Sequence, residues 1–140
     1  MNTKNLLLGG LAGGVAFFLL GWLIYGMLLM NYMMSISPYI KGLYRSEEEM
    51  QLGMMFLSNL CSGLLLALIF DLGKINSWMK GLQYGAIIGI LITSSFDLGS
   101  YAMTFMTTKR LMLMDVMASA VMTGLVGAVV ASINGMGAKK

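Results

Sequence analysis

The stretch Leu6–Met34, LLLGGLAGGVAFFLLGWLIYGMLLMNYMM, contains no charged residue over its whole length. A helix needs roughly 20 predominantly apolar residues to cross a hydrocarbon core of about 30 Å. Within lipid, backbone amide and carbonyl groups must be satisfied inside the segment, which favours a helix over an isolated strand. The stretch is also too long for the apolar region of a signal peptide. It therefore predicts a first membrane-spanning helix that is retained in the protein.

Three further apolar runs follow, and each is also long enough to span a bilayer as a helix. The connections between the runs are short, so consecutive helices are expected to be antiparallel. Ser46 and Glu49 have the spacing of a capping box and predict the start of the second helix. The sequence therefore predicts an all-α fold: an up-down four-helix transmembrane bundle in a single domain, 1–140, with spans at about 6–34, 48–71, 78–106 and 109–134.

The composition excludes several classes of protein. Of the 140 residues, 58% are hydrophobic and only 11% are charged, whereas soluble domains carry about 25% charged residues. The net charge of +3 does not indicate a nucleic-acid partner, because the basic residues are scattered at the ends of the apolar runs. The predicted partner is the lipid bilayer. With no His and one Cys, neither a metal site nor another cofactor is predicted, and the 16 Met residues are interpreted as apolar filler rather than copper ligands.

Lysine and arginine counts on the two sides of the membrane predict the orientation of the chain. The side that holds both termini has the small excess, and acidic residues contribute little to this rule. We therefore predict a multi-pass protein of the inner (cytoplasmic) membrane with both termini in the cytoplasm. The counted residues are Lys4, Lys74, Lys80, Lys139 and Lys140 on the terminal side, and Lys41, Arg45, Lys109 and Arg110 on the other.

Small residues recur at four-residue spacing in several predicted spans. Because lipid tails are as apolar as leucine side chains, helices associate in a bilayer by close packing, which small residues permit. These rows can pack the bundle of one chain, or at least one of them can form the contact of a homo-oligomer. The predicted helix-packing residues are Gly10, Gly14, Gly81, Gly85, Gly89, Ala120 and Gly124.

Two carboxylates lie within the predicted spans, Asp97 in the third and Asp115 in the fourth. An ionisable residue inside a span costs about 2.5–3.5 kcal/mol on insertion scales and is a functional candidate. Asp97 lies on a polar helix face, and Asn59 and Tyr25 are expected at a similar depth. The candidate site for a ligand or a proton comprises Asp97, Asp115, Asn59, Tyr101, Thr93, Ser94 and Tyr25.

Two interpretations of this cluster remain open. Hydroxyl groups and the Asn59 amide can hydrogen-bond Asp97 and simply fix the register of the helices. Alternatively, two carboxylates that share one pocket of low dielectric constant retain a proton that can be exchanged. Arg110 can also neutralise Asp115 by extending from the interface.

The functional prediction follows from the second interpretation. The chain is expected to bind or translocate a small solute or a proton around Asp97, although the pattern does not indicate which solute. The alternative is a non-catalytic structural or accessory subunit that docks partners through its glycine-rich helix faces. No catalytic residue is assigned, because the sequence contains no phosphate loop, Ser–His pair or His–Cys metal spacing.

The second half of the chain, from Gly81 to Gly135, resembles four-helix integral membrane proteins of bacteria and archaea of the domain-of-unknown-function type. The matching features are Gly85 and Gly89, the triplet Phe96-Asp97-Leu98, a short turn at 107–110, and Asp115. Gly99-Ser100 replaces the Thr-Asn of that pattern, and the aromatic residue expected after the last aspartate is missing near Met117. The resemblance implies a four-span inner-membrane protein and pairs Asp97 with Asp115, but it implies no activity.

Overall fold

The computed structural model describes residues 3–43 and 45–138, so Lys139 and Lys140 of the orientation count lie outside the described residues. Within these ranges the chain is helical and contains no strand. The elements are α1 (Thr3–Gly21), the π-helical η1 (Trp22–Leu28), α2 (Met30–Ile36), the 3-10 turn η2 (Glu47–Glu49), α3 (Leu52–Leu72), α4 (Trp78–Met103) and α5 (Lys109–Ala138).

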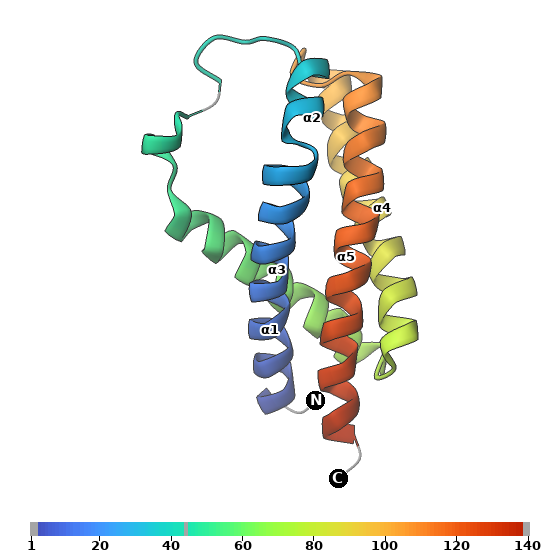
Figure 1. The fold of residues 1–140 in the computed structure, drawn as a ribbon. Helices are drawn as coiled ribbons and strands as arrows, with labels where there is room; N and C mark the ends of the chain where they lie inside the picture. Colours follow the sequence, from blue (N-terminus) through green and yellow to red (C-terminus); the bar gives the residue numbers. More distant parts are fainter. Residues whose placement is uncertain (1–2, 44, 139–140) are drawn as a thin grey trace.

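Four segments are long and apolar enough to cross a membrane: Thr3–Leu28, Leu52–Leu72, Trp78–Met103 and Lys109–Met136. The prediction of an all-α bundle of four such helices is confirmed. α1 begins and α5 ends at the same end of the molecule (Figure 1), as an even number of spans requires.

The start of the second span differs in detail from the prediction. The backbone N–H and the Oγ hydroxyl of Ser46 both donate to Glu49 Oε2, at 3.3 and 3.1 Å. This capping contact closes the separate turn η2, and Gln51 behind it has the non-helical angles φ −94° and ψ 80°. Because Gln51 interrupts the helical backbone, α3 begins only at Leu52.

The four long helices do not close into a ring. α4 packs mainly on α5, and α1 packs mainly on α3. α1 and α5 share a smaller contact that joins the two pairs, and α3 and α5 a smaller one still. α3 and α4 make no extensive contact, although they are consecutive in the chain. α3 runs obliquely to the other helices, and its N-terminal half leans away from them (Figure 1). The bundle is therefore open between α3 and α4.

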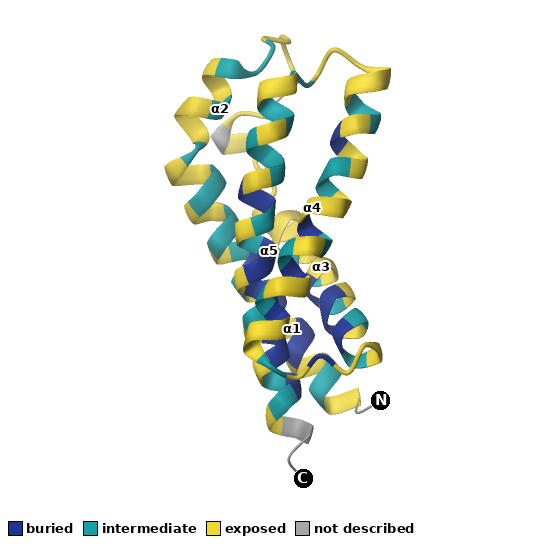
Figure 2. Ribbon diagram, turned by 90° about the vertical axis from the view of Figure 1, so that its right-hand side faces the viewer, coloured by how far each residue is buried: buried dark blue, intermediate teal, exposed yellow. Residues whose placement is uncertain are grey.

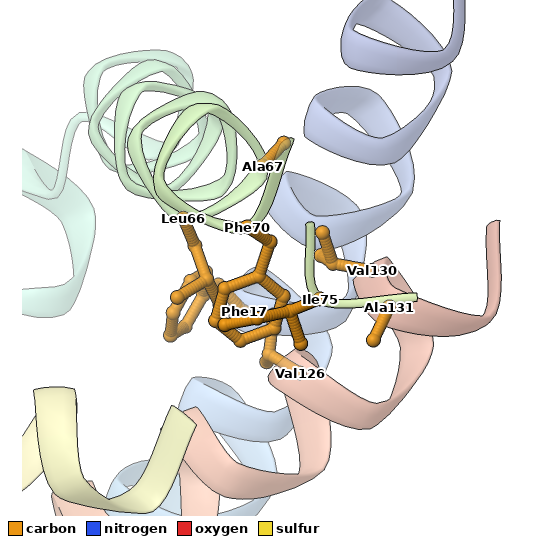
Figure 3. Packing of buried hydrophobic residues seen from close by; sticks show 8 residues of the cluster. All are labelled: Phe17, Leu66, Ala67, Phe70, Ile75, Val126, Val130 and Ala131. Atoms are coloured by element: carbon orange, nitrogen blue, oxygen red, sulfur yellow. The ribbon is translucent and has the colours of Figure 1, made fainter. Parts of the chain in front are cut away.

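Buried residues gather in the half of the bundle near the chain ends, while the other half is largely exposed or intermediate (Figure 2). In a membrane, such exposed apolar side chains face lipid. The core lies where α1, α3 and α5 meet with the connection that follows α3 (Figure 3). It consists of Phe17, Leu66, Ala67, Phe70, Ile75, Val126, Val130 and Ala131.

The glycine rows are used for contacts within the chain. A Cβ atom added to Gly63 of α3 would overlap the backbone of Gly10 and Gly14 in α1. Gly81, Gly85 and Gly89 of α4 lie equally close to the backbone of α5. Gly124 contacts α4 at Leu82 and Ala86, whereas Ala120 is only half-buried.

Candidate functional site: an intramembrane carboxylate pair

The seam between α4 and α5 follows a regular antiparallel register. Gly85 lies against Thr123 and Gly127, and one turn further along, Gly89 lies against Ser119 and Thr123. Four residues on, the Thr93 hydroxyl donates to Ser119 Oγ at 2.6 Å. Each step of four residues along α4 is thus matched by a step of four back along α5, as two antiparallel helices in close contact require.

The next step of this register pairs Asp97 with Asp115. Asp97 is only 8% exposed, and its Oδ2 atom is buried with no hydrogen-bond partner. Asp115 is close enough for its charge to act on Asp97. The glycine contacts at one end of the seam therefore fix two acidic side chains opposite each other at the other end.

Tyr25 supplies the contact that holds Asp115. Its hydroxyl donates to Asp115 Oδ1 at 2.6 Å and lies 3.3 Å from the backbone oxygen of the same residue. A length of about 2.5–2.7 Å is typical of a charge-assisted bond between a hydroxyl group and a carboxylate. The first membrane span therefore contacts the acidic pair through Tyr25, which lies in its π-helical part η1.

Tyr25 lies within the π-helical segment, which the sequence analysis did not anticipate. The Leu29 N–H donates to the Ile24 carbonyl oxygen at 2.8 Å, a bond that spans five residues. π-helical turns are rare and occur frequently at functional sites. The two glycines Gly21 and Gly26, five residues apart in the sequence, are the local signal that could have indicated a loosened helix here.

The structure brings together Asp97, Asp115, Tyr25 and Thr93 of the predicted residues, and it adds Ser119. Asn59 lies apart on α3, where its side-chain N–H donates to the Met55 carbonyl oxygen at 2.7 Å. The Tyr101 side chain is 43% exposed, and Ser94 is half-buried beside the seam. Among the described residues, the Asn59 side chain thus bonds its own helix, and no hydrogen bond joins it to Asp97.

The electrostatics of the pair are those of two unneutralised acids. Among residues 3–43 and 45–138, no ion pair joins a basic side chain to Asp97 or Asp115, and Arg110 is exposed. A charge buried in hydrocarbon is costly unless it is paired. Two facing carboxylates without a cation therefore favour the uptake of a proton or of a positively charged group. The described residues hold no cluster of three or more His, Cys, Asp or Glu side chains that could bind a metal ion.

A groove lies one helical turn from Asp97, and neither Asp97 nor Asp115 is among the residues that line it. It has a volume of about 240 Å³ and is walled by all four long helices. Thr93 and Ser119, which hydrogen-bond each other one turn below Asp97, belong to its lining. The groove also contains Asn59 and Ser62 of α3. The groove thus ends one helical turn short of Asp97.

We expect Tyr25→Phe to destabilise the protein by removing the hydrogen bond to Asp115. The variant removes one intramembrane hydrogen bond, worth about 1 kcal/mol, and leaves Asp115 Oδ1 without its 2.6 Å donor. The measurement is the midpoint of thermal unfolding in detergent micelles. The matched control is Tyr84→Phe, at an exposed tyrosine of α4. An equal midpoint shift in both variants would show that the Tyr25 hydroxyl contributes nothing specific.

No known protein-family model, curated protein sequence or solved structure matches the chain. Its fold defines it as a multi-pass α-helical membrane protein, because its four long helices have the length and apolar character of membrane spans.

Proposed function

We propose that the protein binds a proton or a small solute within the membrane, and that Asp97 is the group that takes it up and releases it. One observation carries this proposal: the buried Asp97 carboxylate has an oxygen without a partner and faces a second acid. A residue that only fixed the helix register would be expected to have its polar atoms satisfied.

The three side chains have different roles in this proposal. Asp115 accepts a hydrogen bond from the Tyr25 hydroxyl, a contact that stabilises a negative charge on its carboxyl group. Asp97 lacks such a donor on Oδ2 and carries the exchangeable proton. When that proton leaves, repulsion between the two carboxylates favours its replacement by another proton or by a cationic solute. Whether binding leads to transport depends on access from both sides of the membrane.

The alternative of an accessory subunit that docks partners through glycine faces has less support. Gly10 and Gly14 are covered by α3, and Gly81, Gly85 and Gly89 are covered by α5. These rows are therefore occupied by the chain's own helices, and a homo-oligomer would have to use other surfaces.

We further propose that the chain resides in the inner membrane with both termini in the cytoplasm. The support is the count of Lys and Arg in the sequence, which is five on the terminal side, with Lys139 and Lys140 included, against four on the other side.

The proposal is tested by infrared difference spectroscopy of the purified protein in lipid nanodiscs during a pH titration. A carboxyl that exchanges a proton gives a pH-dependent C=O stretching band, and Asp97→Asn is expected to remove it. Asp71→Asn is the control, because Asp71 lies at the end of α3 away from the pair. A band that persists unchanged in Asp97→Asn, or that is absent from the wild-type protein at every pH, would overturn the proposal.

A further inference from the structure

We propose that the solute is a lipophilic ammonium ion that enters the groove sideways from the bilayer, between α3 and α4. This inference rests on the proposed function, because it takes the Asp97–Asp115 pair as the charged end of the binding site. It adds the chemical class of the ligand and its route.

The lining of the groove indicates a ligand with an apolar body. Most of its wall is hydrocarbon, from Phe17 of α1 through the leucine and isoleucine side chains of α3 and α4 to Met122 of α5. Its volume of about 240 Å³ suits a small organic molecule and far exceeds that of a single water. The ligand therefore buries hydrocarbon against hydrocarbon over most of its surface.

The opening of the groove is set by the lean of α3. α3 is held to α1 where Gly63 crosses Gly10 and Gly14, so its N-terminal half is free to diverge from α4. A Cβ atom added to Gly53, near the start of α3, would meet nothing within 4 Å. Since both helices that flank the opening have the length and character of membrane spans, the opening faces acyl chains. A ligand dissolved in the bilayer can thus enter without crossing water.

The polar part of the lining selects for a positive charge. Asn59 and Ser62 each donate their hydrogen bond to a carbonyl of their own helix, at 2.7 and 3.1 Å. Thr93 likewise donates to Ser119. What these groups still offer a ligand is mainly oxygen lone pairs, which accept hydrogen bonds or contact a cation.

The carboxylate pair sets the sign and number of the ligand's charges. Asp97 lies one helical turn beyond Thr93 on the same face of α4. Neither aspartate lines the groove, but a negative charge on the pair acts across one helical turn of low-dielectric protein and makes this end of the groove electronegative. With Asp115 stabilised by Tyr25, one cation replaces one proton on Asp97, so a monovalent ammonium group matches the pair and an anion is repelled.

The experiment measures binding of benzyltrimethylammonium to the protein in phosphatidylcholine nanodiscs by equilibrium dialysis, with empty nanodiscs as the blank. Tetramethylammonium, which lacks the apolar body, and benzylsulfonate, which reverses the charge, are expected to bind at least about tenfold more weakly, a difference of about 1.4 kcal/mol. Asp97→Asn is expected to weaken benzyltrimethylammonium binding by a similar factor. Lower pH is expected to compete with the ligand.

A matched pair of variants on α3 tests the groove itself. Ser62→Leu fills the groove from an exposed position and is expected to weaken binding at least about tenfold. Ser58→Leu makes the same change one turn away, outside the lining, and is expected to leave binding within about twofold. Both positions are exposed, so neither change should disturb folding.

The possible outcomes distinguish failure of the ammonium site from failure of the proposed proton exchange at Asp97. If benzyltrimethylammonium binds no better than benzylsulfonate, the proposed ligand class is wrong. If Ser62→Leu leaves binding intact, the ligand does not bind in the groove. If the pH-dependent carboxyl band of Asp97 persisted in that case, proton exchange at the pair would stand alone. If Ser62→Leu also removes the pH-dependent carboxyl band, the substitution disturbs the Asp97–Asp115 pair itself. That result would contradict a groove that binds the ligand without altering the pair.

Discussion

Gly85→Leu is expected to separate α4 from α5 and to prevent the protein from reaching its folded state. A Cβ atom at this position would overlap the Thr123 carbonyl oxygen, and the Cα atoms of Gly124 and Gly127 would each lie 3.2 Å from it. These obstacles are backbone atoms, which cannot turn aside as a flexible side chain can. Overpacking of an ordinary core costs about 1–3 kcal/mol, and a leucine against rigid backbone should exceed the upper end of that range.

The measurement is the fraction of purified protein that remains monodisperse in detergent after heating. The control is Gly99→Leu, which makes the same change on the same helix. A Cβ atom at Gly99 would meet only the end of the Met103 side chain, at 4.0 Å, so this variant should change stability by no more than about 0.5 kcal/mol. Equal losses at Gly85 and Gly99 would contradict the seam as the main contact between α4 and α5.

Hydropathy was sufficient to predict the four helices, because the length of an uninterrupted apolar run is set by the thickness of the bilayer. Hydropathy could not predict the interruption of the first helix at Leu29, between η1 and α2, or the start of α3 at Leu52. The break depends on which carbonyl each N–H bonds, as in the bond from Leu29 to Ile24, and apolar residues do not specify that choice. The tilt of α3 has no sequence signal either, since lipid solvates an apolar helix at any angle.

The small-residue rows show where prediction of packing ends. The four-residue spacing singled out Gly81, Gly85 and Gly89 of α4, and all three lie close to the backbone of α5. On α5, two adjacent rows contain small residues, one through Ala120 and Gly124 and the other through Ser119, Thr123 and Gly127. The prediction took Ala120 and Gly124 and continued their face through Gly127 and Ala131, whereas the closest contacts with the α4 glycines run through Ser119, Thr123, Gly127 and Ala131. Composition alone could not choose between rows that differ by one residue.

The sequence predicted how deep the site residues lie in the membrane, but not which direction each helix face points. Distances along the helices placed Tyr25, Asp97 and Asp115 in the same half of the bundle, and the structure brings them together. Asn59 was also expected there, yet its side chain bonds its own helix. Which face a residue presents depends on helix pairing, and the sequence of one helix does not contain that information.

Asp97→Val is expected to make the fold more stable while abolishing proton exchange at this position and weakening ammonium binding at least about tenfold. Valine is close to aspartate in size and removes both the unpartnered oxygen and the repulsion from Asp115. Replacing buried ionic groups by apolar residues of similar volume is often stabilising, by about 1–4 kcal/mol. Asp115 keeps the Tyr25 hydroxyl as its donor. On the proposed function, the protein keeps this costly acid at the expense of stability.

The comparison is between the thermal unfolding midpoints of the wild type, Asp97→Val and the control Asp71→Val, with the pH-dependent carboxyl band recorded on the same samples. Asp71 ends α3 away from the pair, so its replacement should leave both the band and ligand binding unchanged. If Asp97→Val instead unfolds at a lower temperature than the wild type, the carboxylate holds α4 and α5 in register. A structural role would then explain its burial, because a residue kept for binding alone has no reason to stabilise the seam.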